Sequence, residues 1–398
     1  MKTSFKILFC ILVLLLTSHC KKEEPIVTIS DNNFLNALLQ LGVDKNGDGE
    51  ISNSEAEAIK SLNLGSKNIS DFTGIESFIN LDTLNCSINN FSVLDISKNT
   101  KLKYLDCSDN SLITLDVSLN KELTELDCNG NILSVLDVSN NTCIKNLNCG
   151  LNHLSSLDIS KNLVLTKLEC YFNNLTSLDV TSNTALISLN CVENQITSLD
   201  VSYNTVLKEL FCHSNQLSSL DVSKNLALTV LICYSNGIIS LDVSKNTRLI
   251  SMDCSNNPFT NLDVSKNISL LILTCESNLL TNLDVTKNSS LYSLDCDKNQ
   301  LTSLDISLNR NLTELYCRFN QITSLDVSKN SQLTTLWCSG NKLATLNIAQ
   351  NIYLRNLWID NMLSLYKVCV WSASFPSSDI FLNAQDSPNV YYSTVCNK

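Results

Sequence analysis

Residues 102–121 read Leu-Lys-Tyr-Leu-Asp-Cys-Ser-Asp-Asn-Ser-Leu-Ile-Thr-Leu-Asp-Val-Ser-Leu-Asn-Lys, and similar stretches recur around them every 21 residues. Thirteen cysteines mark this interval from Cys86 to Cys338, and an asparagine follows each of them three positions later, from Asn89 to Asn341. A strict interval of this size indicates one small structural unit stacked on copies of itself. We therefore predict a solenoid in which equivalent residues lie directly above one another.

Each unit contains two half-motifs, Leu-x-x-Leu-x-Cys-x-x-Asn and Leu-x-x-Leu-Asp-Val-Ser-x-Asn. Both have the apolar alternation of a short strand, and neither leaves room for a helix. The pattern predicts a β-rich solenoid of about 15 coils over residues 61–361, with short strands on both faces. Because both sides would then have the ~4.8 Å spacing of paired strands, we expect little curvature and a length on the order of 60 Å for thirteen coils.

The half-motifs match the leucine-rich repeat pattern Leu-x-x-Leu-x-Leu-x-x-Asn/Cys-x-Leu. The chain resembles the 21-residue class of bacterial leucine-rich repeat proteins, with cysteine where most members carry leucine, and the resemblance covers residues 61 to 361. A 22-residue variant repeat that begins at Leu62 resembles the N-terminal module of internalin-type proteins. The asparagines of both half-motifs are expected to bond to the backbone of adjoining coils and to be structural.

The chain contains 18 cysteines. The thirteen of the repeat would point in parallel, which disfavours the roughly 90° torsion of a disulfide, so we interpret them as free, buried apolar groups. Cys369 and Cys396 lie beyond the repeat and are predicted to form a disulfide that staples a C-terminal cap over residues 362–398. Cys143 breaks the pattern of its own repeat, and the sequence offers no explanation for it.

Residues 1–20 have the composition of an export signal, since basic residues precede an apolar run, residues 7–16, that is too short to span a bilayer. They resemble a bacterial lipoprotein signal, in which Cys20 would be lipidated, although His19 replaces the small residue expected before it. The linker, residues 21–30, begins Lys-Lys-Glu-Glu-Pro, which resembles the sorting tag of some Gram-negative surface lipoproteins. We expect a monomer that is lipid-anchored to the outer membrane and exposed at the cell surface, with secretion as the alternative.

The formal charge of -11, from 39 acidic and 28 basic residues, opposes binding to nucleic acid or to anionic lipid surfaces. No later segment reaches the roughly 18 uninterrupted apolar residues of a membrane helix. Only a lipid is therefore expected to hold the protein at a membrane.

The two faces of the predicted solenoid differ in composition. In the second half-motif an aspartate fills the central outward position of twelve coils, from Asp95 to Asp326, and hydrogen bonds from serine and backbone plus nearby lysines would offset the repulsion of about 1 kcal/mol per neighbouring pair. A chelating array is the alternative interpretation. In the first half-motif the outward residues vary, which is where a repeat scaffold can encode recognition.

Two clusters stand out on the variable face. Tyr171, Val192, Phe211, His213, Ile232 and Tyr234 form the first, and Tyr316, Arg318, Trp337 and Trp358 form the second. Aromatic residues and arginine are enriched in protein interfaces, so these residues are predicted to bind a protein or glycan partner. Unrelated aromatic residues in strands with good β propensity are the alternative.

Residues 31–60 are predicted to form a helical N-terminal cap that contains a calcium loop. Asp44-Lys45-Asn46-Gly47-Asp48-Gly49-Glu50-Ile51-Ser52-Asn53-Ser54-Glu55 fits the EF-hand pattern. The ligands would be Asp44, Asn46 and Asp48, the carbonyl of Glu50, Ser52 through water, and both oxygens of Glu55. Since only one such loop is present, we expect a weak structural calcium site; a polar turn between two helices is the alternative.

The sequence gives little support for catalysis. His153 and His213 fall on different coils without a nucleophile and an orienting group beside either. The sequence therefore predicts a surface-displayed binding or adhesion module rather than an enzyme, with a passive envelope or matrix protein as the alternative.

Overall fold

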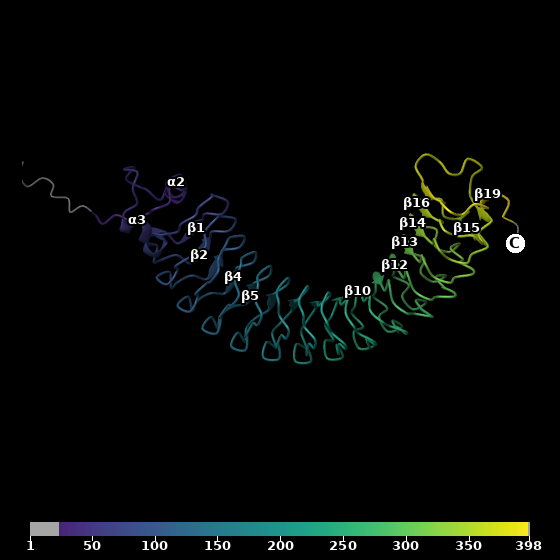
Figure 1. The fold of residues 1–398 in the computed structure, drawn as a ribbon, viewed down its shortest axis with the longest axis horizontal. Helices are drawn as coiled ribbons and strands as arrows, with labels where there is room; N and C mark the ends of the chain where they lie inside the picture. The colour runs from purple at the N-terminus through teal and green to yellow at the C-terminus, as the bar shows by residue number, and fades with distance from the viewer. Residues whose placement is uncertain (1–23, 397–398) are drawn as a thin grey trace, which may run out of the picture.

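The computed structural model describes residues 24–396, so the export signal and Cys20 lie outside the described residues. The chain forms a single curved solenoid with a small helical cap at its N-terminal end (Figure 1). Within residues 24–396, no helix is long and apolar enough to cross a membrane.

One parallel sheet of sixteen strands runs the length of the solenoid. Its strands are β1 (Ser61–Asn63), β2 (Thr83–Asn85), β3 (Tyr104–Asp106), β4 (Glu125–Asp127), β5 (Asn146–Asn148), β6 (Lys167–Glu169), β7 (Ser188–Asn190), β8 (Glu209–Phe211), β9 (Val230–Ile232), β10 (Ser251–Asp253), β11 (Ile272–Thr274), β12 (Ser293–Asp295), β13 (Glu314–Tyr316), β14 (Thr335–Trp337), β16 (Asn356–Trp358) and β18 (Phe381–Asn383). Each strand is only three residues long, because the first half-motif turns as soon as its central leucine and the cysteine have entered the core.

The register of the sheet follows the 21-residue interval. Leu105 lies opposite Leu126, and Leu126 lies opposite Leu147, so that like side chains are stacked along the core. The thirteen repeat cysteines are free and buried beside them, which confirms their interpretation as core residues. Cys143 is also free, but it is exposed.

The expectation of a straight rod is wrong, because the solenoid forms an arc with the sixteen-stranded sheet on its concave side (Figure 1). The second half-motif lies on the convex side and pairs between coils only near the C-terminus, where β15 (Thr345–Asn347), β17 (Lys367–Cys369) and β19 (Tyr391–Ser393) form a second sheet. In most coils the aspartate of this half-motif instead bonds within its own coil, as when Asp116 accepts from the Ser118 N–H at 2.9 Å. Without a continuous ladder the convex side spaces the coils more widely, and the stack bends.

Two ladders of buried asparagines connect the coils, as predicted. In the first series, Asn152 donates to the carbonyl of Cys128 in the preceding coil and accepts from the N–H of Leu133. In the second series, Asn162 donates to the carbonyls of Val138 and Asn141, while its own carbonyl oxygen has no hydrogen-bond partner. Both series direct their amide donors toward the preceding coil.

Two short helices form the N-terminal cap, as predicted. Helix α2 (Asn32–Gln40) begins after Asp31, whose carboxylate accepts from the N–H groups of Asn33 and Phe34, and it buries Phe34 against the first coils. Helix α3 (Asn53–Ala58) begins with a capping box in which Ser52 and Glu55 bond to each other's backbone N–H. A 3-10 turn, η1 (Ile75–Ser77), follows β1.

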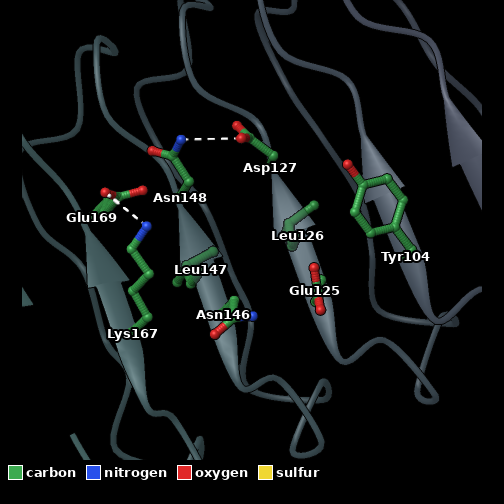
Figure 2. A pocket seen from close by; sticks show the side chains of 9 residues that line it. All are labelled: Tyr104, Glu125, Leu126, Asp127, Asn146, Leu147, Asn148, Lys167 and Glu169. Carbon is green, nitrogen blue, oxygen red and sulfur yellow. Dashed lines mark hydrogen bonds and ion pairs between the residues drawn. The ribbon is translucent and has the colours of Figure 1, made fainter. Parts of the chain in front are cut away.

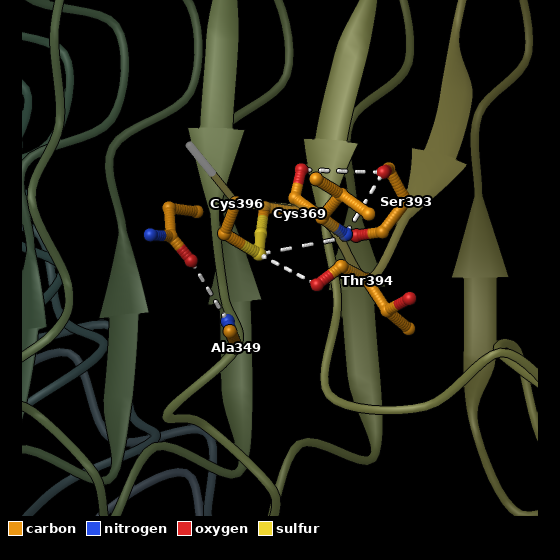
Figure 3. The surroundings of a disulfide bond; sticks show 7 residues. Ala349, Cys369, Ser393, Thr394 and Cys396 are labelled. Carbon is orange, nitrogen blue, oxygen red and sulfur yellow. Dashed lines mark hydrogen bonds between the residues drawn. A yellow bond between two sulfur atoms is a disulfide. The ribbon is translucent and has the colours of Figure 1, made fainter. Parts of the chain in front are cut away.

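The C-terminal cap continues the stack with coils that are longer than 21 residues. Strand β18 pairs with β16, and β17 and β19 extend the convex sheet. A disulfide joins Cys369 in β17 to Cys396 beyond β19, with 5.6 Å between their α-carbons (Figure 3). The predicted disulfide is thus confirmed, and it ties the last residues of the described chain to the convex sheet.

Candidate binding face

The concave face consists of the side chains at the first and third positions of each strand in the sixteen-stranded sheet, together with the second residue after the strand. The central residue of each strand points into the core, so the two flanking residues must point outward. Most of these outward side chains are half-buried between their neighbours in adjacent strands. The face is therefore a closely packed surface on which each residue has the residue 21 positions away as its neighbour.

Four residues of the first predicted cluster form one patch on β8 and β9. Phe211 lies opposite Ile232 in the register, and the ring of His213 stacks on the ring of Tyr234 with centroids 4.0 Å apart. Burial lowers the pKa of His213, which favours the neutral imidazole in this stack. We call these four residues the central patch.

The other two members of that cluster do not join the central patch. Tyr171 turns toward the N-terminal coils, where its hydroxyl donates to Asn129 two coils away at 2.9 Å. It can do so because residue 150 is glycine, and a Cβ atom there would come within 2.6 Å of the tyrosine ring. Val192 is only 7% exposed, so its predicted place in an exposed cluster is wrong.

The second predicted cluster is brought together as an aromatic ladder with arginine. Trp337 stacks on Trp358 with centroids 4.4 Å apart, and Tyr316 meets Trp337 edge to face at 4.8 Å. The guanidinium of Arg318 lies 4.3 Å from the ring centroid of Trp337. Since these planar groups cover one another's faces, chiefly their edges are left for a partner.

Arg318 also makes an ion pair that sequence reasoning missed. Its Nη2 atom lies 2.6 Å from a carboxylate oxygen of Asp297, a residue of the preceding coil that is completely buried. Burial raises the pKa of Asp297, although the guanidinium acts in the opposite direction. The interval of 21 residues between the two positions was the signal that could have revealed the pair.

An acidic stretch separates the central patch from the aromatic ladder. Burial raises the pKa of Asp295 to about 7 and also raises the pKa of Asp253. Glu276 pairs with Lys298 at 2.6 Å at the edge of the face. The negative charges here are thus only partly balanced by cations of the chain itself.

Two hollows in the concave face were not predicted. One has a volume of about 190 Å³ and is lined by side chains of β3 to β6, including Tyr104, Glu125 and Asp127 (Figure 2). The other, of about 370 Å³, lies beside Tyr234, Asp253 and Glu276. Such hollows depend on the relative sizes of neighbouring side chains, for which the sequence carries no simple signal.

The convex aspartates accept the hydrogen bonds that the less specialised interpretation predicts, but in the described chain they form no close ion pairs with the nearby lysines. Asp221, for example, accepts a hydrogen bond from the Ser223 N–H at 2.8 Å, and this bond lowers the pKa of its carboxyl group. No ion pair within 4.0 Å joins these aspartates to the nearby lysines among the ion pairs of the described residues.

The loop predicted to bind calcium lies between α2 and α3. Asp44 accepts from the N–H groups of Gly47 and Gly49, and Glu55 accepts from those of Lys45 and Ser52, so the carboxylates already organise the loop. The hydrogen bonds to Glu55, above all the one from the Ser52 N–H, lower the pKa of its carboxyl group and keep it charged. The oxygen donors fit calcium by type.

The side chains of the loop are not gathered around a common point. The Asn46 amide donates to Asp48 at 2.7 Å. Over residues 24–396, no three histidine, cysteine, aspartate or glutamate side chains lie together as metal ligands would. The carboxylates of Asp44, Asp48 and Glu55 would have to move closer together to hold an ion.

Comparisons with known proteins agree with this architecture. A family profile described as "Leucine Rich repeats (2 copies)" matches residues 310–364. The functional domain of InlJ from Listeria monocytogenes, described as including a cysteine ladder, is 36% identical, with a TM-score of 0.79 over 85% of this chain and 74% of that one. YopM from Yersinia pestis is 22% identical, with a TM-score of 0.67 over 88% of this chain and 98% of that one, which is a similarity of fold. A sequence search of curated proteins found no match.

The chain therefore belongs to the leucine-rich repeat family. Within that family it is internalin-like, since it resembles the InlJ domain in sequence, at 36% identity, as well as in fold.

Proposed function

We propose that the protein is a cell-surface binding module that holds a protein or glycan partner on its concave face. The observation that carries the proposal is the aromatic ladder of Tyr316, Trp337 and Trp358 with Arg318 beside it. Large aromatic side chains and arginine are the residues that most often dominate binding energy in interfaces. The central patch adds a second anchor on the same face, and its strand β9 lies four strands before β13.

The proposal is tested by capture of surface material with variants of each face. Phe211→Ala with Tyr234→Ala removes the anchors of the central patch, and Trp337→Ala is added in a second variant. The control is Tyr203→Ala with Tyr353→Ala, because these two tyrosines are exposed and lie outside the concave face. We expect the concave variants to lose at least tenfold in capture from cells or their surroundings, which is the usual loss for an interface anchor. Equal capture by all folded variants would contradict the proposal.

A passive envelope or matrix role is the second candidate, and the uniform convex face of aspartates favours it. In that role no residue of the concave face would matter for retention at the envelope. The same variants decide between the two, since a matrix protein would keep its distribution in each of them.

Lipid anchoring at Cys20 is a further part of the proposal and rests on the signal-like residues 1–20. A Cys20→Ala variant expressed in a Gram-negative host should appear in the medium instead of the membrane fraction. Labelling with a fatty-acid analogue should mark the parent chain and not the variant.

We propose as well that the loop between α2 and α3 binds calcium weakly and stabilises the N-terminal cap. Calcium would be added during thermal unfolding of the parent, of Asp44→Ala and of Glu50→Ala. Asp44 would be a side-chain ligand, whereas Glu50 would use only its carbonyl, so the second variant is the matched control. We expect a calcium-dependent rise in melting temperature for the parent and Glu50→Ala alone; identical responses of all three would remove the proposed site.

A further inference from the structure

The concave face carries a strong excess of negative charge. From β3 to β16 its outward positions hold eleven carboxylates and two permanent cations, Lys167 and Arg318. The carboxylates are Asp106, Glu125, Asp127, Glu169, Glu209, Asp253, Glu276, Asp295, Asp297, Glu314 and Asp360. Both cations are already paired, Lys167 with Glu169 at 3.1 Å and Arg318 with Asp297 at 2.6 Å. Glu276 is also paired, with Lys298 at 2.6 Å. The other eight carboxylates, that is, all except Glu169, Glu276 and Asp297, form no ion pair within 4.0 Å among the described residues and are available to a partner.

We infer that the partner on the concave face is a cationic polypeptide whose lysine or arginine side chains enter the two hollows described above. This inference rests on the proposed function and names the chemistry of the partner. Each hollow combines a tyrosine ring with carboxylates. A lysine ammonium or an arginine guanidinium binds well in such a place, because it forms ion pairs with the carboxylates and packs on the ring.

The N-terminal hollow is open between Tyr104 and the carboxylates of Glu125 and Asp127 (Figure 2). Asp127 accepts a hydrogen bond from the Asn148 amide at 3.0 Å, which orients it but does not neutralise it. The Asn129 N–H donates to Asp127 as well, at 3.0 Å, yet burial still raises the pKa of this carboxyl group. Lys167 also lines the hollow, but its ion pair is with Glu169, so no cation of the described chain pairs with Asp127. An ammonium group entering between these side chains would supply such a cation.

The C-terminal hollow lies between Tyr234 and the carboxylates of Asp253 and Glu276. Its wall includes Ser255, whose N–H donates to Asp253 at 2.9 Å and orients that carboxylate without neutralising it. Burial raises the pKa of Asp253, so a cation in the hollow would offset the cost of keeping this group charged.

The separation of the hollows suits an extended chain. Strand β4 borders the first hollow and β10 the second, and six steps of ~4.8 Å place them roughly 29 Å apart. An extended polypeptide covers this distance in about nine residues. The central patch lies between the hollows and would contact apolar side chains of the same segment.

Other partners fit the face less well. Nucleic acids and acidic glycans would be repelled by the carboxylates. A neutral sugar needs a free aromatic face, whereas the rings of Trp337 and Trp358 cover each other. A metal ion could use the carboxylates alone, and the experiment separates that case.

The probe is a labelled synthetic peptide of about 14 residues with two lysines about nine positions apart, to match the spacing of the hollows. A control peptide has norleucine at both lysine positions. Binding to the full chain is followed by fluorescence anisotropy at low and at physiological salt. We expect the lysine peptide to bind at least tenfold more tightly than the control and to weaken as salt is raised.

Two variants with the same change in net charge locate the site. Glu125→Gln, Asp127→Asn and Asp253→Asn together alter the hollows, while Asp179→Asn, Asp200→Asn and Asp221→Asn together alter the convex face. We expect the first to lose at least tenfold in affinity and the second to stay within about twofold, because screening confines the effect to nearby charges. Circular dichroism melting of each variant verifies that it is folded.

Three outcomes would overturn the inference. The two variants could lose peptide affinity equally, or the protein could bind the lysine and norleucine peptides equally well. Calcium could also displace the peptide completely at the concentration that saturates the loop of the N-terminal cap, which would indicate an inorganic cation site. If the lysine peptide fails while capture of surface material still depends on Phe211 and Tyr234, the proposed function stands and only the cationic partner is rejected. If capture of surface material does not depend on Phe211 and Tyr234 either, both the proposed function and the cationic partner are rejected.

Discussion

Aspartates on the two faces of the solenoid behave in opposite ways. Burial between closely spaced strands raises the pKa of Asp253 on the concave face. Asp221 on the convex face accepts a hydrogen bond from the N–H of Ser223, and its pKa is lowered. Asp253 also accepts from the N–H two residues later, that of Ser255, at 2.9 Å, so the difference between the two aspartates arises from burial and not from the backbone bond. Water stabilises the exposed convex carboxylates, whereas the concave carboxylates have lost part of their hydration.

The largest effect is expected where a concave charge has a buried partner. Arg318→Ala would leave Asp297 buried and unpaired, at a cost of about 3–5 kcal/mol in the free energy of unfolding. Lys298→Ala removes the half-exposed pair with Glu276 and should cost less than about 1 kcal/mol. Chemical denaturation measures both values, and a small loss for Arg318→Ala would show that water reaches Asp297.

The second-largest effect is expected from the two asparagine ladders, which should contribute differently to the free energy of unfolding. Asn194 of the concave side donates to three carbonyls and accepts from the N–H of Leu175, whereas Asn204 of the convex side donates to two carbonyls and leaves its own oxygen without a partner. We expect Asn194→Ala to cost about 3 kcal/mol and Asn204→Ala about 1–2 kcal/mol, in proportion to the groups left unpaired. Equal values in denaturation experiments would mean that the convex ladder has bonds that the structure does not contain.

The pH dependence of stability should have opposite signs on the two faces. With its pKa raised to about 7 from 3.8, Asp295 keeps a proton in the folded chain that the unfolded chain has released. Stability therefore falls as pH rises between these values, and the penalty is fully present above pH 7. Asp295→Asn should stabilise the protein at pH 8 by on the order of 2 kcal/mol and have little effect near pH 3.

Asp221→Asn is the matched change on the convex face. The lowered pKa of Asp221 means that its carboxylate adds stability above its ordinary pKa, which is lost as pH falls through the folded value. The variant should be slightly less stable than the parent at pH 7 and equal to it at low pH. Thermal melting across pH checks both variants, and the same sign for both would remove the distinction between the faces.

The smallest effect is expected at Cys143, the exposed exception among the free cysteines of the described chain. Cys143→Ser should change stability by less than about 0.5 kcal/mol, because its side chain is exposed. A thiol reagent should label Cys143 in the folded protein and leave the thirteen core cysteines unmodified until unfolding, since burial raises the pKa of thiols such as Cys191 and Cys233 to about 12. Mass spectrometry of labelled peptides measures this, and labelling of core cysteines in the native state would indicate local opening.

Much of the fold could be predicted because one interval determined it. The spacing of Cys107 and Cys128 implied that one lies above the other, and the disulfide between Cys369 and Cys396 followed from their position beyond the repeat. Curvature could not be predicted in the same way. The second half-motif has the alternation of a strand, but its aspartate bonds to its own coil, and sequence alternation does not distinguish these two uses of an extended segment.

The sequence predicted most residues of the candidate site, but it did not predict correctly in every case which of them lie together. Phe211, His213, Ile232 and Tyr234 come together, as do Tyr316, Arg318, Trp337 and Trp358. Tyr171 leaves the first group because Gly150 opens a space on its other side. Exposed Phe172 and Phe319 were missed, although each occupies the same left-handed position, with φ of 49° and 51°, directly before an asparagine of the first series.

The asparagine amides of every coil reach back to the coil before it and never depend on the identity of the outward residues. A whole unit could therefore be deleted or duplicated in register, and each remaining amide would still find its carbonyl. Such an exchange would leave both end caps untouched while shifting the central patch relative to the aromatic ladder. The distance between the two groups can thus change in steps of one coil, while the residues of the core stay the same.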